Sequence, residues 1–480
     1  MGKSIKHNLL YSTFYQLLVM IIPLITSPYL SRVLGPENIG IYSETNAFAY
    51  YFFIIAMLGV NNYGNREVSK TRDNKEKLSD TFWQIYYIQF FLTIVTSLCY
   101  IILIVFIIKK NVIIYFLQLF YVLSALFDIN WFAFGMEEFK LTTIRSTFIK
   151  IVNTLLIFLL VKNSEDLIIY TLIMVLGNIF GLFMVWPLVS KYTYFRKPIF
   201  KLIIHHLKPN IVLFIPLVAS SMYQYMDKIL IGIFVNSKEV GFYNYAQNII
   251  SLSTSLMLGF TNVLMPRMSN MVIYNKEKSL KMVEKSIKYT TVLNIGVMFG
   301  LISISSEFIP LYLGKEYMYT ALLLQILTIS IPISGFANIL RTTYLIPFKK
   351  DYIYVKSIIY GSIVDIVTNI LLLPIISAVG SCIASILTYF TISFFQCFDT
   401  RKELNYNKYL LNCVIFLFIG LFMFLVVSML KGCTSSEILS IIIRIIAGVF
   451  VYSILSIIVL FIQKDMYLIN IIKRLFKREE

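Results

Sequence analysis

The sequence predicts an all-α integral membrane protein of about fourteen transmembrane helices, with both termini in the cytoplasm. Three observations support this class. First, 58% of the 480 residues are hydrophobic and 14% are charged, whereas soluble domains are roughly half apolar and one quarter charged. Second, apolar runs of about 20 residues, the length needed to cross a bilayer, recur along the whole chain. Third, the segments between these runs are short and alternate between basic and nearly uncharged.

Fourteen apolar segments are long enough to be transmembrane helices. The first lacks the small-residue cleavage site of a signal peptide and is therefore interpreted as a membrane helix. The predicted spans are residues 8–30, 39–61, 81–108, 112–135, 146–162, 166–190, 210–234, 240–264, 289–313, 319–346, 354–374, 378–398, 408–430 and 437–462.

The lysine and arginine residues set the predicted orientation. Most of these 42 residues fall in segments that are cytoplasmic when the N-terminus is inside, and few fall in the external loops. This asymmetry is the positive-inside rule, and an even number of spans returns the C-terminus to the cytoplasm. The net charge of +17 therefore reflects topology, and no nucleic-acid partner is expected.

Matched features in the two halves predict an internal duplication. Residues 39–42 (IGIY) match 240–243 (VGFY), Leu58-Gly59 recurs as Leu258-Gly259, and Pro23-Leu24 recurs as Pro216-Leu217. Repeats of this kind are common in transporters. The predicted parts are an N-terminal six-helix lobe at 1–190, a cytoplasmic amphipathic linker at 191–209, a C-terminal six-helix lobe at 210–398, two additional helices at 408–462 and a basic cytoplasmic tail at 463–480.

The linker contains its own predicted helix. Residues 197–207 (KPIFKLIIHHL) place apolar side chains at helical spacing between basic ones, a pattern typical of helices that lie in the membrane interface. The histidines His7, His205 and His206 fall in cytoplasmic segments, and we expect them to be solvated surface residues.

No motif indicates chemical catalysis. The sequence has no GxxxxGK[ST], GxSxG or HExxH pattern, and its five cysteines show no paired or metal-like spacing. The predicted external loops hold roughly ten residues or fewer, which is too short for a catalytic domain. We therefore expect neither an enzyme nor a metal site or organic cofactor.

Ionisable residues at membrane depth are the candidates for function. A charge at the bilayer centre costs at least about 2.5–3.5 kcal/mol, so these side chains should either form structural ion pairs or line a water-accessible cavity. The residues well inside predicted spans are Glu44, Asp128, Asp227, Lys228 and Asp365; those nearer the ends include Arg32, Glu307, Arg341 and Arg444.

Particular expectations follow for several of these charges. Asp227 and Lys228 are adjacent, so on a helix they point about 100° apart and cannot simply pair. Asp365 and Asp128 stand alone in apolar surroundings and are candidates for ion coupling. Arg32 and Arg444 are expected to extend outward to the headgroups.

Prolines and aromatic residues complete the pattern. Prolines in or at the ends of spans are expected to bend helices that act as hinges; they are Pro23, Pro28, Pro216, Pro332 and Pro374. Aromatic residues make up 16% of the chain. We expect most of them to be headgroup anchors and lipid-facing surface, with sugar-binding platforms in the minority.

Several short segments together resemble Wzx-type oligosaccharide flippases, in the polysaccharide transporter branch of the MATE-like superfamily. They are residues 28–35 (PYLSRVLG), 39–42 (IGIY), 63–67 (YGNRE), 226–232 (MDKILIG) and 240–243 (VGFY). The resemblance implies two six-helix lobes around a central cavity that carries undecaprenyl-diphosphate-linked oligosaccharide repeat units to the outer leaflet. It implies membrane lipid and a polysaccharide polymerase as further partners, and a proton or sodium ion as the coupling ion.

On this sequence, the motif positions of the resemblance are Arg32, Asp227 and Lys228, and the depth of Glu44 and Arg341 adds them as candidate substrate-binding residues. Other interpretations remain open: a MATE-type exporter of cationic drugs, a lipid II flippase, an integral polymerase or glycosyltransferase, and a structural scaffold. The mixture of Lys228 with acidic residues argues against a purely cation-binding cavity.

Overall fold

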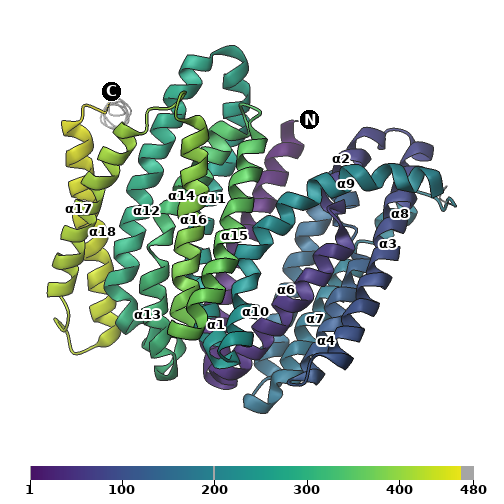
Figure 1. Ribbon diagram of the computed structural model, residues 1–480, viewed down its shortest axis with the longest axis horizontal. Helices are drawn as coiled ribbons and strands as arrows, with labels where there is room; N and C mark the ends of the chain where they lie inside the picture. The colour runs from purple at the N-terminus through teal and green to yellow at the C-terminus, as the bar shows by residue number, and fades with distance from the viewer. Residues whose placement is uncertain (1, 198–199, 466–480) are drawn as a thin grey trace. The chain divides into compact units, whose positions relative to one another are not determined.

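The structure is a computed structural model that describes residues 2–197 and 200–465, except for the side chains of residues 2–19, 200–202, 204 and 256–263. Every regular element within these ranges is helical (Figure 1). The elements are α1 (Gly2–Met57), α2 (Val60–Thr71), α3 (Lys75–Phe106), α4 (Val112–Leu123), η1 (Ser124–Phe127), α5 (Asn130–Gly135), α6 (Phe139–Leu160), η2 (Ser164–Asp166), α7 (Leu167–Phe183), α8 (Pro187–Tyr192), α9 (Phe200–Ser221), η3 (Met222–Met226), α10 (Asp227–Phe234), α11 (Ser237–Tyr274), α12 (Lys276–Leu313), η4 (Lys315–Tyr317), α13 (Met318–Leu327), α14 (Ser330–Leu340), η5 (Arg341–Leu345), α15 (Asp351–Ile376), α16 (Ala378–Thr400), α17 (Asn407–Met429) and α18 (Glu437–Ile462).

Each predicted span coincides with one helix or with consecutive helical segments, so the all-α membrane class is confirmed. Within the described residues, nine helices are long and apolar enough to cross a bilayer, and a bent pair makes a tenth. The other predicted spans lie in α1, in α9 to α10 and in α11. The basic tail predicted at 463–480 lies almost wholly outside the described residues.

A glycine separates the first two spans. Gly35 has a φ of 74°, in the left-handed region, and this single residue kinks α1 where the sequence predicts the first external loop. Pro23 and Pro28 lie inside α1 without ending it.

Two spans at corresponding positions of the predicted repeat are discontinuous. The fourth span consists of α4, η1 and α5, and the tenth consists of α13, α14 and η5, with a bend of 47° between its two halves. Each breaks about three turns after its start. Paired discontinuous helices are a feature of transporter folds, in which the breaks adjoin binding sites.

Contacts divide the chain into two compact units. The first comprises Met1–Asn244 with Asn369–Ala378, and the second comprises Tyr245–Thr368 with Val379–Glu480. The predicted boundaries at 190 and 210, and the separation of 408–462, remain predictions from the sequence.

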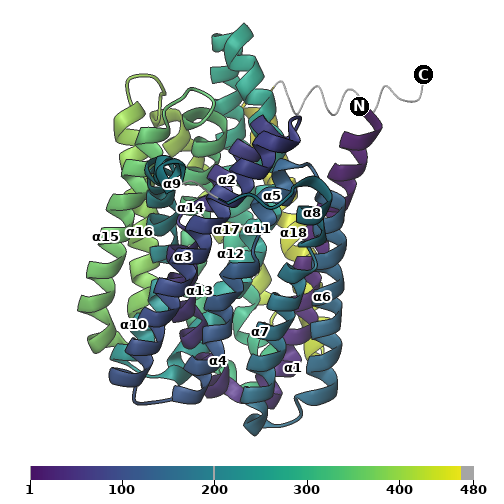
Figure 2. The same ribbon diagram turned by 90° about the vertical axis from the view of Figure 1, so that its right-hand side faces the viewer.

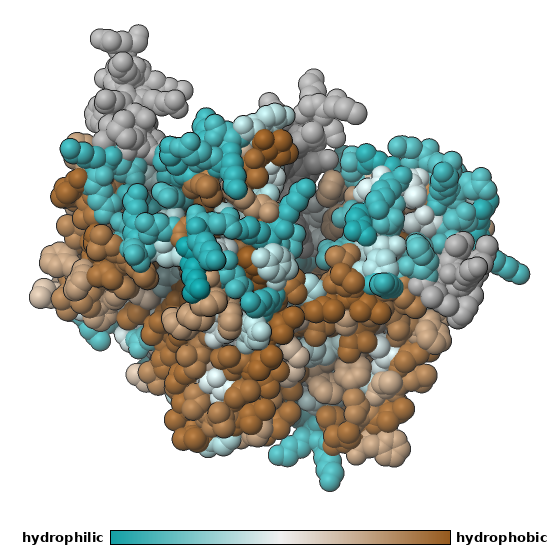
Figure 3. Space-filling model, turned by 45° about the horizontal axis from the view of Figure 1, so that its top comes forward, coloured by the Kyte–Doolittle hydropathy of each residue, from teal (hydrophilic) through white to brown (hydrophobic). Residues whose placement is uncertain are grey.

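Hydrophobic side chains cover most of the lower part of the face shown in Figure 3, and hydrophilic ones gather mainly over its upper part. Apolar side chains that point outward include Phe91 of α3 and Phe418 of α17, which are 65% and 68% exposed. In water such exposure would be costly, so these surfaces are suited to lipid.

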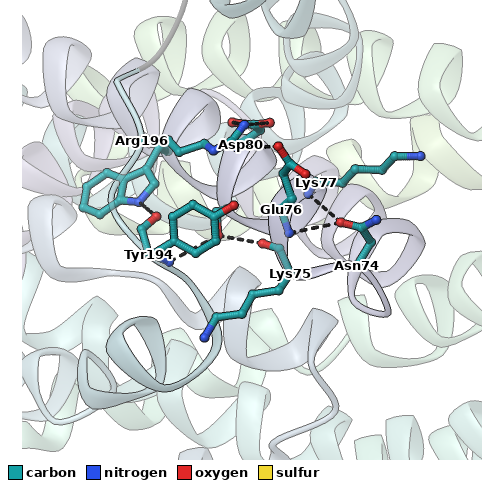
Figure 4. A network of polar contacts seen from close by, with 9 residues as sticks. Asn74, Lys75, Glu76, Lys77, Asp80, Tyr194 and Arg196 are labelled. Atoms are coloured by element: carbon teal, nitrogen blue, oxygen red, sulfur yellow. Dashed lines mark hydrogen bonds and ion pairs between the residues drawn. The ribbon is translucent and has the colours of Figure 1, made fainter.

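The predicted linker helix is the beginning of α9. Figures 1 and 2 show that the first part of α9 lies across the neighbouring helices, as an interfacial helix would. It continues without interruption past Pro209 into the seventh predicted span. The chain before it is fastened to the start of α3 (Figure 4): Arg196 binds Asp80 at 2.9 Å and also Glu76, and Trp83 donates a hydrogen bond to the carbonyl of Tyr194 at 3.0 Å.

In the second unit, α18 is fastened to α12 along its length. Arg444 is 2% exposed and forms an ion pair with Glu307, and Lys288 pairs with Asp465 at 2.8 Å beyond the other end of α18. Between them, the Tyr452 hydroxyl donates to the carbonyl of Val292 at 2.6 Å. The expectation that Arg444 extends outward is therefore wrong, because the partly buried Glu307 carboxylate offers its guanidinium a partner within the protein.

Candidate functional site

Two candidate residues lie directly after a widened helical turn in the first unit. The segment η3 is a π-helical turn between α9 and α10, and Asp227 follows it. Such turns are rare in proteins, and many of those that occur are found at functional sites. Asp227 is fully buried, and its carboxylate accepts hydrogen bonds from the Tyr243 hydroxyl and, at 2.8 Å, from the Asn369 amide.

Lys228 points away from Asp227. Its amine donates to the side-chain oxygen of Asn244 at 2.9 Å and lies 5.9 Å from the centre of the Tyr225 ring. Within the described residues, no ion pair joins Lys228 to a carboxylate. The prediction that neighbouring charges on this helix do not pair is confirmed. A cation at membrane depth without a contacting carboxylate attracts anions.

Glu44, on α1, faces α10 at Gly232, four residues after Lys228. It accepts hydrogen bonds from Ser237 at 3.1 Å and Tyr115 at 3.4 Å. It packs over Gly232, where an added Cβ would lie 2.3 Å from the Glu44 carboxyl carbon. Three candidates, Glu44, Asp227 and Lys228, are thus brought together within the first unit.

The repeat predicted from residues 39–42 and 240–243 has a structural counterpart that positions these charges. A Cβ on Gly40 would lie 1.6 Å from the carbonyl oxygen of Ser237, and a Cβ on Gly241 would lie 1.9 Å from that of Pro36. Gly40 therefore contacts the backbone four residues before Gly241, and Gly241 contacts the backbone four residues before Gly40. Such a reciprocal contact is expected of a two-fold repeat. Gly59 also faces α9, whereas the surroundings of its counterpart Gly259 are not among the described features.

Asp128 occupies the break in the fourth span. Its carboxylate accepts from the backbone and side chain of Asn130 at 3.1 and 2.7 Å, and its carbonyl accepts from Gln89 at 2.9 Å. Gln89 in turn accepts from the Trp131 indole at 3.0 Å. The Asp128 carboxylate therefore satisfies one backbone donor, the Asn130 N–H, that the broken helix leaves open.

The second unit contains two further candidates. Arg341 begins the π-helical turn η5 and donates to Asn338 at 2.7 Å and Tyr354 at 3.1 Å, with the Tyr354 ring 5.2 Å away. Asp365 is fully buried on α15 and accepts from Thr388 at 2.9 Å. The π-helical turns η3 and η5 of the described residues thus each adjoin a candidate charged residue: Asp227 follows η3, and Arg341 begins η5.

Arg32 is not part of the group around Asp227. It is exposed, and its guanidinium donates to the carbonyl of Pro28 at 2.8 Å on the same helix. Among the residues that the structure describes, no three histidine, cysteine or acidic side chains lie close enough to hold a metal ion.

The structure also shows a polar junction around Tyr63 and His206 that the sequence reasoning missed. The Tyr63 hydroxyl lies 2.6 Å from Nδ1 of His206, whose Nε2 lies 2.9 Å from Gln84. The neighbouring Gly64 lets the Trp131 ring approach to 2.5 Å of where a Cβ would stand. His206 therefore joins three helices, so the expectation that it is solvated is wrong. Burial and the neighbouring His205 lower its pKa.

These features define a class: a polytopic membrane protein with charges buried among discontinuous helices, the arrangement of secondary transporters. The sequence pattern of the family described as "Polysaccharide biosynthesis protein" matches residues 5–272, more than half of the chain. The chain belongs to this family.

Individual proteins share the sequence or the fold over most of their length. A protein of Escherichia coli (strain K12) named "Putative O-antigen transporter" is 24% identical over 421 residues, which are 85% of this chain and 99% of that protein. The lipid II flippase MurJ, in an inward closed conformation, has a similar structure with a TM-score of 0.76 at 16% identity, over 96% of this chain and 99% of its own. An inward-facing multidrug resistance MATE transporter matches with a TM-score of 0.60 at 12% identity, over 80% and 98%. The MATE-like fold is confirmed by these structures.

Proposed function

We propose that the protein is a flippase that moves undecaprenyl-diphosphate-linked oligosaccharide repeat units from the inner to the outer leaflet by alternating access. The product would serve the assembly of O-antigen, capsule or exopolysaccharide. Membership of the polysaccharide biosynthesis family and the similarity to a protein named as an O-antigen transporter support this substrate class. The similarity to a lipid II flippase supports a fold suited to a lipid-linked sugar.

The observation that carries the proposal is the environment of Lys228. A diphosphate has about two negative charges, and a lysine amine without a contacting carboxylate can bind it by charge-assisted hydrogen bonds. Arg341, in the second unit, is proposed separately as a phosphate-binding residue, because its guanidinium can bind phosphate in a bidentate manner. Asp227, whose carboxylate already accepts two hydrogen bonds, would hold α10 in place.

Coupling to a proton or sodium gradient is part of the proposal. Outward movement of two uncompensated negative charges would gain roughly 4.6 kcal/mol per 100 mV of inside-negative potential. Neutralisation of both charges by cationic side chains would cancel that gain, so an acidic residue is needed to bring in a cation. Asp365 and Asp128 are the proposed residues for this role.

The proposed location is the bacterial cytoplasmic membrane, with both termini inside, as the distribution of basic residues indicates. A polysaccharide polymerase that consumes the translocated unit is the proposed protein partner.

Reconstitution in liposomes tests the proposal. Movement of a fluorescent undecaprenyl-diphosphate oligosaccharide is measured beside that of lipid II and of a cationic dye. We expect the oligosaccharide lipid to cross, and dye efflux without lipid movement would overturn the flippase assignment. Lys228→Ala should slow lipid movement at least tenfold, whereas Lys238→Ala, at an exposed lysine of α11, should not. For coupling, transport that is insensitive to pH, to sodium and to Asp365→Asn would remove Asp365 from the mechanism.

A further inference from the structure

Five tyrosines of the first unit form a group that the proposed diphosphate contacts do not use. Tyr50 stacks on Tyr225 with the ring centres 4.0 Å apart, and Tyr42 meets Tyr170 edge-on at 4.7 Å. Tyr121 lies within electrostatic range of Tyr42, Tyr50 and Tyr225 and so connects the two pairs. These five residues are called the tyrosine surface.

The tyrosine surface faces the interior of its unit. Its members come from α1, α4, α7 and the π-helical turn η3, and α1 contacts each of the other three elements. The outward faces of the same helices carry aliphatic and phenylalanine side chains: Ile168 of α7 is 42% exposed and Phe120 of α4 is 44% exposed, whereas Tyr170 is 7% exposed. The tyrosines are thus on the side away from lipid.

The hydroxyls of the tyrosine surface are open. Other tyrosines of this unit use theirs within the protein: Tyr29 donates to Val161 at 2.6 Å and Tyr100 to the carbonyl of Tyr115 at 3.0 Å. Within the described residues, none of the five hydroxyls of the tyrosine surface bonds to the protein, yet none is sealed from solvent. Five accessible hydroxyls in one place, none bonded to a described protein group, can together exchange hydrogen bonds with a polyhydroxylated ligand.

The neighbouring charge of Lys228 restricts the classes of ligand that the tyrosine surface can bind. The ring faces alone would also suit a cation, but the Lys228 amine lies 5.9 Å from the Tyr225 ring and would repel one. A neutral or weakly acidic sugar can place its C–H face on a ring and exchange hydrogen bonds with the hydroxyls. Tyr42 and Tyr50 are eight positions apart on α1 and therefore about 12 Å apart along its axis, which is longer than a single sugar ring.

We infer that the tyrosine surface binds the glycan part of the substrate, beyond its first sugar, while Lys228 binds nearer the diphosphate. This inference rests on the proposed function and assigns these tyrosines to recognition of a pyranose oligosaccharide. It differs from the expectation that most aromatic residues here are lipid-facing anchors.

The test compares two lipids in liposomes: undecaprenyl-diphosphate with one N-acetylglucosamine, and the same lipid extended to a tetrasaccharide, each labelled on its last sugar. Tyr42→Phe and Tyr121→Phe keep the rings and remove one hydroxyl each. Each should slow the tetrasaccharide lipid about fivefold, the effect of one hydrogen bond, and should change the one-sugar lipid less than twofold. Tyr86→Phe is the matched control, since Tyr86 is a partly buried tyrosine of the same unit that is not one of the five and packs on Trp186; it should change neither rate.

Equal slowing of both lipids by the phenylalanine variants would overturn the inference, because the tyrosines would then act only on the protein itself. So would unchanged movement of the tetrasaccharide lipid. If the wild-type protein moves neither lipid, the proposed function fails, and binding of the free tetrasaccharide to the purified protein decides the inference: weaker binding by the Tyr42→Phe, Tyr121→Phe double variant supports it, and equal binding overturns it.

Discussion

The crossing of α1 and α11 at Gly40 and Gly241 gives a prediction whose size can be worked out from the structure. An alanine at Gly40 would place its Cβ 1.6 Å from the Ser237 carbonyl oxygen, and one at Gly241 would place it 1.9 Å from that of Pro36. Both obstacles are backbone atoms, which cannot move aside as a flexible side chain can. An ordinary contact of about 3.4 Å requires the helices to separate by roughly 1.8 and 1.5 Å.

Such a separation removes more than the crossing itself. Forced overpacking costs about 1–3 kcal/mol, and the Ser237 hydrogen bond to Glu44 adds about 1 kcal/mol when it is lost. We therefore expect each alanine variant to lose about 2–4 kcal/mol of stability. The two losses should be similar, because the contacts are reciprocal.

The assay is thermal denaturation in detergent, followed by the fraction of protein that remains monodisperse on size exclusion. Gly300→Ala is the matched control, since it lies in helix α12 with nothing within 4 Å of the added Cβ. It should be neutral or stabilising by up to about 1 kcal/mol. A Gly40→Ala or Gly241→Ala protein as heat-stable as wild type would refute the close contact of α1 and α11. Equal losses of stability in all three variants would refute it as well.

Three further predictions concern polar contacts outside the candidate site. Glu307→Leu should lower the free energy of unfolding by about 3–5 kcal/mol because it leaves Arg444 buried without its carboxylate partner. The double variant Glu307→Leu, Arg444→Met should recover most of that stability in the same assay. A double variant as unstable as the single one would contradict this. Arg196→Ala should speed chymotrypsin cleavage after Tyr194 and Phe195 by releasing this segment from Asp80, while Lys197→Ala should not; equal rates would show that the ion pairs do not hold it. Hydrogen bonds from Lys350 and Tyr344 lower the pKa of Glu403, which lies between two predicted spans, from its ordinary 4.5. The stability difference between wild type and Glu403→Gln should therefore be full above pH 4.5 and shrink as the pH falls through the lowered pKa, and a difference that grows on acidification would contradict the ion pair.

The helices were predictable because their signal is local. A run of about 20 apolar residues must cross the bilayer whatever surrounds it, and the sequence places every span on a helical segment of the structure. The divergence of Asp227 and Lys228 was predictable for the same reason, since it follows from the turn of a single helix. The glycine match between 39–42 and 240–243 indicated the repeat, although not the reciprocal contact.

Features that depend on distant partners were not predictable. Arg444 meets Glu307, which lies 137 residues away, and His206 meets Tyr63 at a separation of 143 residues. One sequence contains no signal for such pairings, so outward-pointing or solvated side chains were the natural expectation. The π-helical turns before Asp227 and at Arg341 were missed as well, because a single widened turn leaves the hydrophobic pattern of a span nearly unchanged. The roles of Arg32, Glu44, Asp128, Asp365 and the other deep charges stay predictions.

The attachment of α18 to α12 means that a label near α18 can report movement of α12. Because contacts near both ends and in the middle join these helices, a displacement of α12 during transport should carry α18 with it. The turn between α17 and α18 contains the exposed Cys433, a natural attachment point for a spin label or fluorophore once the exposed Cys99 is replaced. Distances measured from that point would follow the transport cycle from the periphery, without a probe among the buried charges.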